Sequence, residues 1–158
     1  MAPGINPPSA SEPSAIKNVA GMYDWYQQGR EQDGAAIEAG IRVQEHIPNA
    51  KAWVRENRAM VNCAVGWLAK NGVTQVVDLG SGKPSPHGKS THEAVNRVTS
   101  ESRVLYVEIE ATAVIEGRRM IRKGGWSEKV AMIQESALDP ASVVRNREAA
   151  QIIDWNKP

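Results

Sequence analysis

A short apolar run leads directly into an acidic residue and two glycines. Residues 76–82 read Val-Val-Asp-Leu-Gly-Ser-Gly, so a strand that carries Asp78 enters a turn made by Gly80, Ser81 and Gly82. Glycines in such a turn adopt positive φ and let the backbone come close to a ligand, as nucleotide-like cofactors require. Because the turn follows a strand and an acidic residue, the pattern favours a cofactor-binding turn over an ordinary tight turn.

Two other nucleotide-binding motifs are incomplete in this region. The dinucleotide fingerprint Gly-x-Gly-x-x-Gly needs a third glycine where the chain has Ser85. The segment Gly88-Lys89-Ser90 looks like the end of a P-loop, but the first glycine of that motif would fall on Lys83. Pro84 and Pro86 also lack the amide N–H groups that cradle a phosphate. A dehydrogenase or NTP-binding protein is therefore disfavoured, while another Rossmann-like nucleotide-binding protein stays open as an alternative.

A second acidic residue, Glu108, ends the apolar run Leu105-Tyr106-Val107. An acidic side chain at the end of the second strand of a nucleotide-binding sheet can accept hydrogen bonds from both hydroxyls of a ribose. One β-α unit separates Glu108 from the glycine turn, so a parallel sheet would bring the two side by side. The glycine turn and Glu108 together are a more specific sign of a nucleotide-like cofactor site than either feature alone.

Alternating strands and helices are predicted after Gly72 to position these residues. Apolar runs at 76–79, 104–107 and 130–133 predict strands, and apolar residues at helical spacing predict helices between them. Units of this kind form a parallel sheet with right-handed crossovers, which binds ligands at the carboxyl ends of its strands. Asp139-Pro140 then predicts the start of a last helical region.

Helices are predicted for the first half of the chain. Apolar residues recur at helical spacing over 14–29, over 33–47 and most regularly over 50–71, where Asn49 is the expected N-cap. The third helix has one apolar stripe. Its members are Trp53, Val54, Met60, Val61, Ala64, Val65 and Leu68.

These patterns divide the chain into three parts. Residues 1–13 contain prolines among small residues and predict a disordered tail. Residues 14–72 form a predicted N-terminal helical cap, and residues 73–158 a partial Rossmann-like domain. The aromatic residues of 23–26 are more typical of a packed core than of a pocket, although an interaction module built on that helix also stays open.

Composition excludes several classes of protein. The 158 residues are 41% apolar and 23% charged, as in one globular domain. The net charge of +1 gives no strong nucleic-acid signal, and no apolar run is long enough to span a membrane. The one cysteine, Cys63, has no Cys or His at ligand spacing, so we expect no metal site and no disulfide. A cytoplasmic location follows as the expectation.

A series of short motifs runs in order through most of the chain. They are 14–26 with Gly29, Ile47-Pro48-Asn49-Ala50, Glu56-Asn57-Arg58-Ala59, 77–84, Thr91-His92-Glu93 and 104–108. In this order they resemble the bacterial S-adenosylmethionine-dependent methyltransferase family that was first known as a domain of unknown function. Each motif alone is common, so the specificity lies in their order.

The resemblance implies an α/β, Rossmann-like class I methyltransferase fold and S-adenosylmethionine as cofactor. Asp78, Gly80, Ser81 and Gly82 would then approach the methionine and ribose part of the cofactor, and Glu108 would hold the ribose hydroxyls. Catalysis in such enzymes is largely the positioning of a nucleophile in line with the methyl group, without a metal. The implied function is methyl transfer to an acceptor that the sequence does not identify, and no catalytic residue is assigned.

Three departures from the family pattern matter. Glu108 replaces a more usual Asp, and Ser136 stands where an Asp would meet the adenine amino group, at a cost of about 1 kcal/mol in affinity. The sequence stops where the family enters its fourth strand, so the sheet is expected to be truncated after the third. In the usual strand order, 3-2-1-4-5-7-6, the strand at 76–79 would become an exposed edge that invites homo-oligomers. A noncatalytic or degenerate cofactor-binding fragment is therefore a further alternative.

Overall fold

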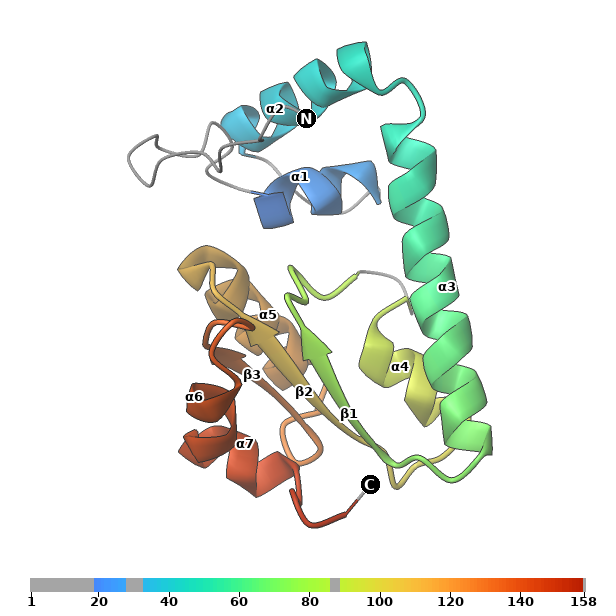
Figure 1. The fold of residues 1–158 in the computed structure, drawn as a ribbon, viewed down its shortest axis with the longest axis vertical. Coiled ribbons are helices and arrows are strands. Elements are labelled where there is room, and N and C mark those ends of the chain that lie inside the picture. Colours follow the sequence, from blue (N-terminus) through green and yellow to red (C-terminus); the bar gives the residue numbers. More distant parts are fainter. Residues whose placement is uncertain (1–18, 28–32, 86–88, 158) are drawn as a thin grey trace, which may run out of the picture.

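The computed structural model describes residues 19–27, 33–85 and 89–157. Its centre is a parallel three-stranded sheet in the order β1 (Gln75–Leu79), β2 (Arg103–Glu108), β3 (Val130–Gln134). Helices cover both faces of the sheet and extend beyond one end of it (Figure 1). The predicted α/β, Rossmann-like fold with a parallel sheet is confirmed.

The central strand β2 is buried from Val104 to Glu108 because helices pack on both of its faces. Successive side chains of a strand point to opposite faces. Val104 and Tyr106 accordingly pack with α5 (Ala111–Lys123), whereas Leu105 and Val107 pack with α6 (Pro140–Arg145) and α7 (Arg147–Ile152). By contrast, β1 lies at the edge of the sheet and is only half-buried from Gln75 to Asp78.

The long helix α3 (Ala50–Lys70) runs beside the sheet and packs on α4 (Thr91–Asn96), as Figure 1 shows. Val65 of α3 and Val95 of α4 belong to one buried cluster, which also contacts Val76 of β1. Asn71 is the C-cap of α3, and Gly72 follows with φ of 89°. The predicted start and end of this helix are thus confirmed, although the Asn49 side chain makes no capping hydrogen bond.

Helices α1 (Val19–Tyr26) and α2 (Gly34–His46) pack together against the first turns of α3 (Figure 1). The Tyr26 hydroxyl donates a hydrogen bond to the Gly40 carbonyl at 2.7 Å. A Cβ atom on Gly40 would lie 2.7 Å from the Trp25 ring, so a glycine is needed for this contact. Small residues therefore form the buried face of α2, whereas Ile41 is 48% exposed.

The apolar stripe predicted on α3 is only partly buried. Val54 and Val65 are buried, but Trp53 and Met60 are more than 60% exposed. The physical reason is that α1, α2 and α4 contact one side of α3. The apolar stripe extends beyond the surface that they cover, so its outer residues are exposed.

The last helical region begins as predicted. Asp139 caps α6 by accepting a hydrogen bond from the Ser142 amide, with Pro140 in the first turn. The region does not continue as one helix, because the Asn146 side chain accepts hydrogen bonds from the Glu148 and Ala149 amides and starts α7.

The tail predicted at residues 1–13 lies outside the described residues. Within the ranges that the structure describes, no helix has both the length and the apolar character needed to cross a lipid bilayer.

Candidate functional site

A cavity of about 570 Å³ lies at the carboxyl ends of β1 and β2. Its floor is the segment from Asp78 to Lys83 together with residues 108–110, and its walls come from α1 and α3. The predicted site residues Asp78, Gly80, Ser81, Gly82 and Glu108 all line it. This is the end of a parallel sheet at which ligands bind in α/β proteins.

The glycine turn after β1 has the backbone conformation that its sequence predicts. Gly80 and Gly82 have φ of 64° and 63°, in the left-handed region that glycine adopts without strain. The amides of Gly80 and Ser81 both donate hydrogen bonds to the Val107 carbonyl, at 2.9 and 3.1 Å. The turn is therefore held against the end of β2.

Glu108 holds the same turn with its side chain. Its Oε2 atom accepts a hydrogen bond from the Gly82 amide at 2.7 Å, and Oε1 accepts from the Ile109 and Glu110 amides at 2.8 and 2.9 Å. A carboxylate has about four acceptor sites. Three backbone amides therefore leave about one site on Glu108 for a ligand.

Asp78 belongs to a cluster of charged and polar groups on the cavity wall. The Thr91 hydroxyl donates a hydrogen bond to Asp78 Oδ2 at 2.7 Å, and Arg58 Nη1 lies 3.9 Å from the same oxygen. The side chains of Arg58 and Asp78 are 17% and 18% exposed. Two opposite charges therefore stand side by side at the cavity, partly open to a ligand.

Helix α1 forms the wall opposite the sheet. Glu110 Oε1 accepts hydrogen bonds from the Val19 and Ala20 amides at 3.1 and 3.4 Å, which ties the first turn of α1 to the end of β2. Tyr23 and Asp24 line the cavity, whereas their neighbours 25–26 pack in the cluster between α1, α2 and α3. The aromatic segment is thus divided between the cavity wall and the core, not confined to the core.

Ser136 does not line this cavity with the other predicted residues. It follows β3, and its hydroxyl accepts a hydrogen bond from the Leu138 amide at 3.2 Å. The nearby Glu135 amide donates to the Glu108 carbonyl at 3.1 Å, so the end of β3 lies next to the end of β2.

A buried pair of rings lies behind the Asp78 cluster. The Tyr106 hydroxyl accepts a hydrogen bond from the His92 amide at 3.0 Å and is 2.8 Å from His92 Nδ1. Burial lowers the pKa of His92 and raises the pKa of Tyr106, so both side chains are neutral at neutral pH.

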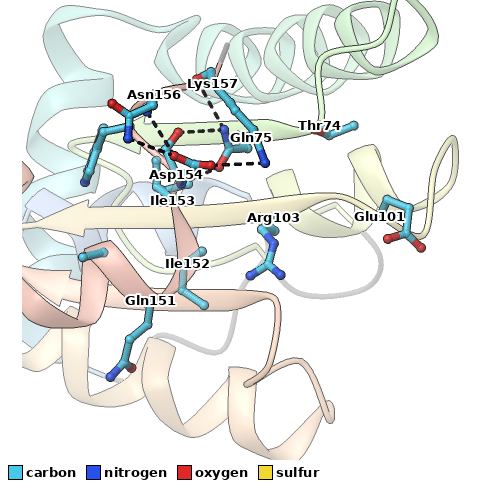
Figure 2. A pocket seen from close by; sticks show the side chains of 12 residues that line it. Thr74, Gln75, Glu101, Arg103, Gln151, Ile152, Ile153, Asp154, Asn156 and Lys157 are labelled. Atoms are coloured by element: carbon cyan, nitrogen blue, oxygen red, sulfur yellow. Dashed lines mark hydrogen bonds and ion pairs between the residues drawn. The ribbon is translucent and has the colours of Figure 1, made fainter.

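A second cavity, of about 540 Å³, lies at the amino end of β1 (Figure 2). There the Gln75 side chain accepts a hydrogen bond from the Asp154 amide at 2.7 Å and donates to the Asp154 and Lys157 carbonyls. Lys157 also pairs with the Asp154 carboxylate at 3.2 Å. These groups satisfy one another, so this cavity offers less for a ligand than the one at the carboxyl ends.

The sequence alone does not point to Arg58 or Thr91 as site residues. Both residues occur in motifs that carried the resemblance, but motif order does not show what a side chain contacts. Their contact with Asp78 spans 20 and 13 positions of sequence and depends on how α3 and α4 pack against β1.

Comparisons with known proteins agree with this fold. A family model described as S-adenosyl methyltransferase matches residues 9–158. A solved structure of a candidate methyltransferase from Thermobifida fusca is similar over 95% of the chain, with 28% identity and a TM-score of 0.81. A solved DUF574 family protein from Streptomyces avermitilis is similar over 89%, with 30% identity and a TM-score of 0.79.

The match covers 56% and 53% of those two chains, so this chain spans about half their length. A comparison with curated proteins gave no match.

Proposed function

This chain belongs to the S-adenosyl methyltransferase family, and on that premise we propose that it carries the half of a methyltransferase that binds S-adenosylmethionine. The proposed site is the cavity at the carboxyl ends of β1 and β2. The observation that carries the proposal is the convergence there of the glycine turn, the Glu108 carboxylate and the Arg58–Asp78 pair.

The charges of the cavity suit the amino acid end of the cofactor. That end carries an ammonium and a carboxylate group, and Asp78 and Arg58 supply one opposite charge for each. Arg58 Nη1 and Asp78 Oδ2 are 3.9 Å apart, which is a long distance for an ion pair. A ligand that contacts both side chains can therefore replace this weak interaction with shorter, charge-assisted hydrogen bonds. Asp78 would therefore bind the ammonium group, and Arg58 the carboxylate.

The ribose would lie between the glycine turn and Glu108. Gly80, Ser81 and Gly82 present backbone without bulky side chains, which permits close approach. Glu108 would accept a ribose hydroxyl at its remaining acceptor site, and a second hydroxyl would have to displace one of the backbone amides.

The adenine would lie beyond Glu108, toward β3. Ile109 lines the cavity and is 63% exposed, which gives an apolar surface for a ring. Ser136 is the proposed partner of the adenine amino group because the end of β3 is hydrogen-bonded to that of β2.

The bound cofactor would supply a methyl group activated by a positively charged sulfur. The part of this chain in catalysis is to hold the cofactor in one orientation, so that an acceptor can attack in line with the departing sulfur. Tyr23 and Asp24 of α1 face the cavity and would limit access to it.

Two further parts of the proposal concern the surroundings of the protein. We propose that the edge strand β1 mediates self-association, because an edge presents unpaired backbone groups. We also propose a cytoplasmic location, because a chain with one cysteine and no possible internal disulfide suits a reducing compartment.

Calorimetric titration of the purified chain tests the function. We expect micromolar binding of S-adenosylhomocysteine, and no binding of NADH or ATP at the same concentrations. Binding of NADH or ATP instead would favour the other nucleotide-binding class, and no binding by a folded sample would overturn the proposal. The mass of the protein in solution, measured alongside, tests self-association.

A further inference from the structure

We propose that Thr91 is a positioning residue that orients the Asp78 carboxylate for the cofactor, and that Tyr106 and His92 hold Thr91 in place. This inference rests on the proposed function, since it concerns the side chain that would bind the ammonium group. It gives a role to Thr91-His92-Glu93, a motif that the proposed site does not otherwise use.

The contact between Thr91 and Asp78 is short and buried. Thr91 is 1% exposed, and its hydroxyl donates to Asp78 Oδ2 at 2.7 Å. Arg58 Nη1 approaches the Thr91 oxygen at 3.5 Å and so can donate to it. The single proton of the hydroxyl is thus directed to Asp78, while its oxygen faces a cation.

This arrangement fixes one oxygen of the carboxylate. Thr91 and Arg58 both contact Oδ2, so rotation of the Asp78 side chain would break the hydrogen bond and separate the ion pair. The other oxygen, Oδ1, is the one that we assign to the ligand. An ammonium group would then meet a carboxylate that is already oriented, which lowers the entropy lost on binding.

Thr91 is itself held from both sides along the backbone. On one side, Ser90 forms a capping box with Glu93, and its hydroxyl donates to the Ser85 carbonyl at 2.6 Å. On the other side, the His92 amide donates to the Tyr106 hydroxyl at 3.0 Å. The start of α4 is therefore attached to both the loop after β1 and the central strand β2.

The Tyr106 and His92 side chains complete that attachment. Both are buried, at 1% and 6% exposed, and Tyr106 Oη lies 2.8 Å from His92 Nδ1. With a neutral imidazole, Nδ1 can accept the hydroxyl proton while the same oxygen accepts the His92 amide. The His92 ring also packs edge-on against Trp126, with 5.1 Å between ring centroids. Tyr106 therefore sets the position of the residue next to Thr91.

The test compares two ligands that differ at the group Asp78 would bind. S-adenosylhomocysteine carries the amino acid group, whereas 5′-methylthioadenosine carries the adenosine and the thioether without it. Dissociation constants for both are measured by calorimetry on the wild-type chain and on Thr91→Val, which keeps the side-chain volume but lacks the hydroxyl. Thr91→Ser restores the hydroxyl, and Thr74→Val, at the opposite end of β1 (Figure 2), is the matched control.

We expect Thr91→Val to weaken binding of S-adenosylhomocysteine roughly five- to tenfold, as for a weakened charged contact, with little change for 5′-methylthioadenosine. Thr91→Ser and Thr74→Val should bind both ligands as the wild type does. Tyr106→Phe should likewise weaken binding of S-adenosylhomocysteine but not of 5′-methylthioadenosine. This second variant tests the inference if Thr91→Val does not fold.

Three results would overturn the inference. Unchanged affinities in Thr91→Val would show that the hydroxyl does not matter for binding, and an equal loss for both ligands would show a general structural defect. Failure of the folded wild-type chain to bind either ligand would refute the proposed function itself, and the inference with it.

Discussion

Glu108 and Gly82 are joined by a hydrogen bond of 2.7 Å from the Gly82 amide to the carboxylate Oε2. It links the end of β2 to the turn after β1 across 26 positions of sequence. The same carboxylate accepts hydrogen bonds from two further amides, at Ile109 and Glu110, so Glu108 shapes the turn through its backbone contacts. A substitution of Glu108 therefore acts both on the turn and on the ribose contact that we propose.

The Glu108→Ala substitution should lower the affinity for S-adenosylhomocysteine by about 10- to 150-fold, because hydrogen bonds to a charged group contribute about 1.5–3 kcal/mol. Calorimetric titration measures the loss, and thermal unfolding reports the separate effect on the turn. Glu101→Ala, at the opposite end of the sheet, is the control and should bind normally. An unchanged affinity in Glu108→Ala would remove Glu108 from the proposed site.

The glycine turn can be tested against a glycine of similar conformation elsewhere. Gly80 and Gly125 have φ of 64° and 74°, and a Cβ at either meets nothing within 4 Å. Valine at either position should cost about 1–3 kcal/mol of stability through backbone strain. Only Gly80→Val should abolish cofactor binding, because its side chain would enter the cavity. Equal binding by the two variants would contradict the assignment of the turn.

Close packing of α5 against the sheet depends on Gly117. A Cβ atom there would overlap Met132 Sδ and lie 3.1 Å from Pro84 Cδ. Gly117→Ala should therefore destabilise the fold by about 1–3 kcal/mol through overpacking. Gly66→Ala is the matched control on α3, where a Cβ meets nothing within 4 Å, and should raise stability by about 0.5–1 kcal/mol. Melting temperatures of the two variants that shift in the same direction would be incompatible with this packing.

His92 should make the stability of the chain depend on pH. Burial lowers its pKa in the folded state, so below about pH 6.5 the unfolded chain binds more protons than the folded chain. The free energy of unfolding should consequently fall as the pH decreases from about 6.5 through the folded pKa. Denaturant titrations at a series of pH values measure this slope.

The variant His92→Gln should flatten the slope in that range, whereas His46→Gln, at an exposed position of α2, should leave it unchanged. A slope that survives in His92→Gln would assign the pH dependence to other groups.

The strands and the glycine turn could be predicted from the sequence because their signals are local. Apolar runs mark the strands, and only glycine suits the positive φ after β1. Asp139-Pro140 likewise predicted the start of α6, since a cap and a proline act within one helical turn. The spacing of one β-α unit also predicted that Glu108 lies beside the glycine turn, and both line the cavity.

The remaining features of the cavity and of helix packing could not be predicted, because they depend on contacts between segments that are distant in the sequence. No local pattern shows that Glu110 binds the first amides of α1, 91 positions away, or that Arg58 lies beside Asp78. The apolar stripe of α3 predicts a helix, but it does not show which of its residues other helices will cover. Trp53, for example, belongs to the stripe and is exposed. Ser136 was placed by resemblance alone, and its role in the site stays a prediction.

Binding of the cofactor at the carboxyl ends of β1 and β2 is best located by NMR, with amide chemical shifts followed while S-adenosylhomocysteine is added to the isotope-labelled chain. We expect the largest changes at residues 78–83 and 108–110, which line the cavity at the carboxyl ends of β1 and β2. Changes centred instead on Gln75 and Asp154 at the opposite end of the sheet, or no changes in a folded sample, would contradict binding at that cavity.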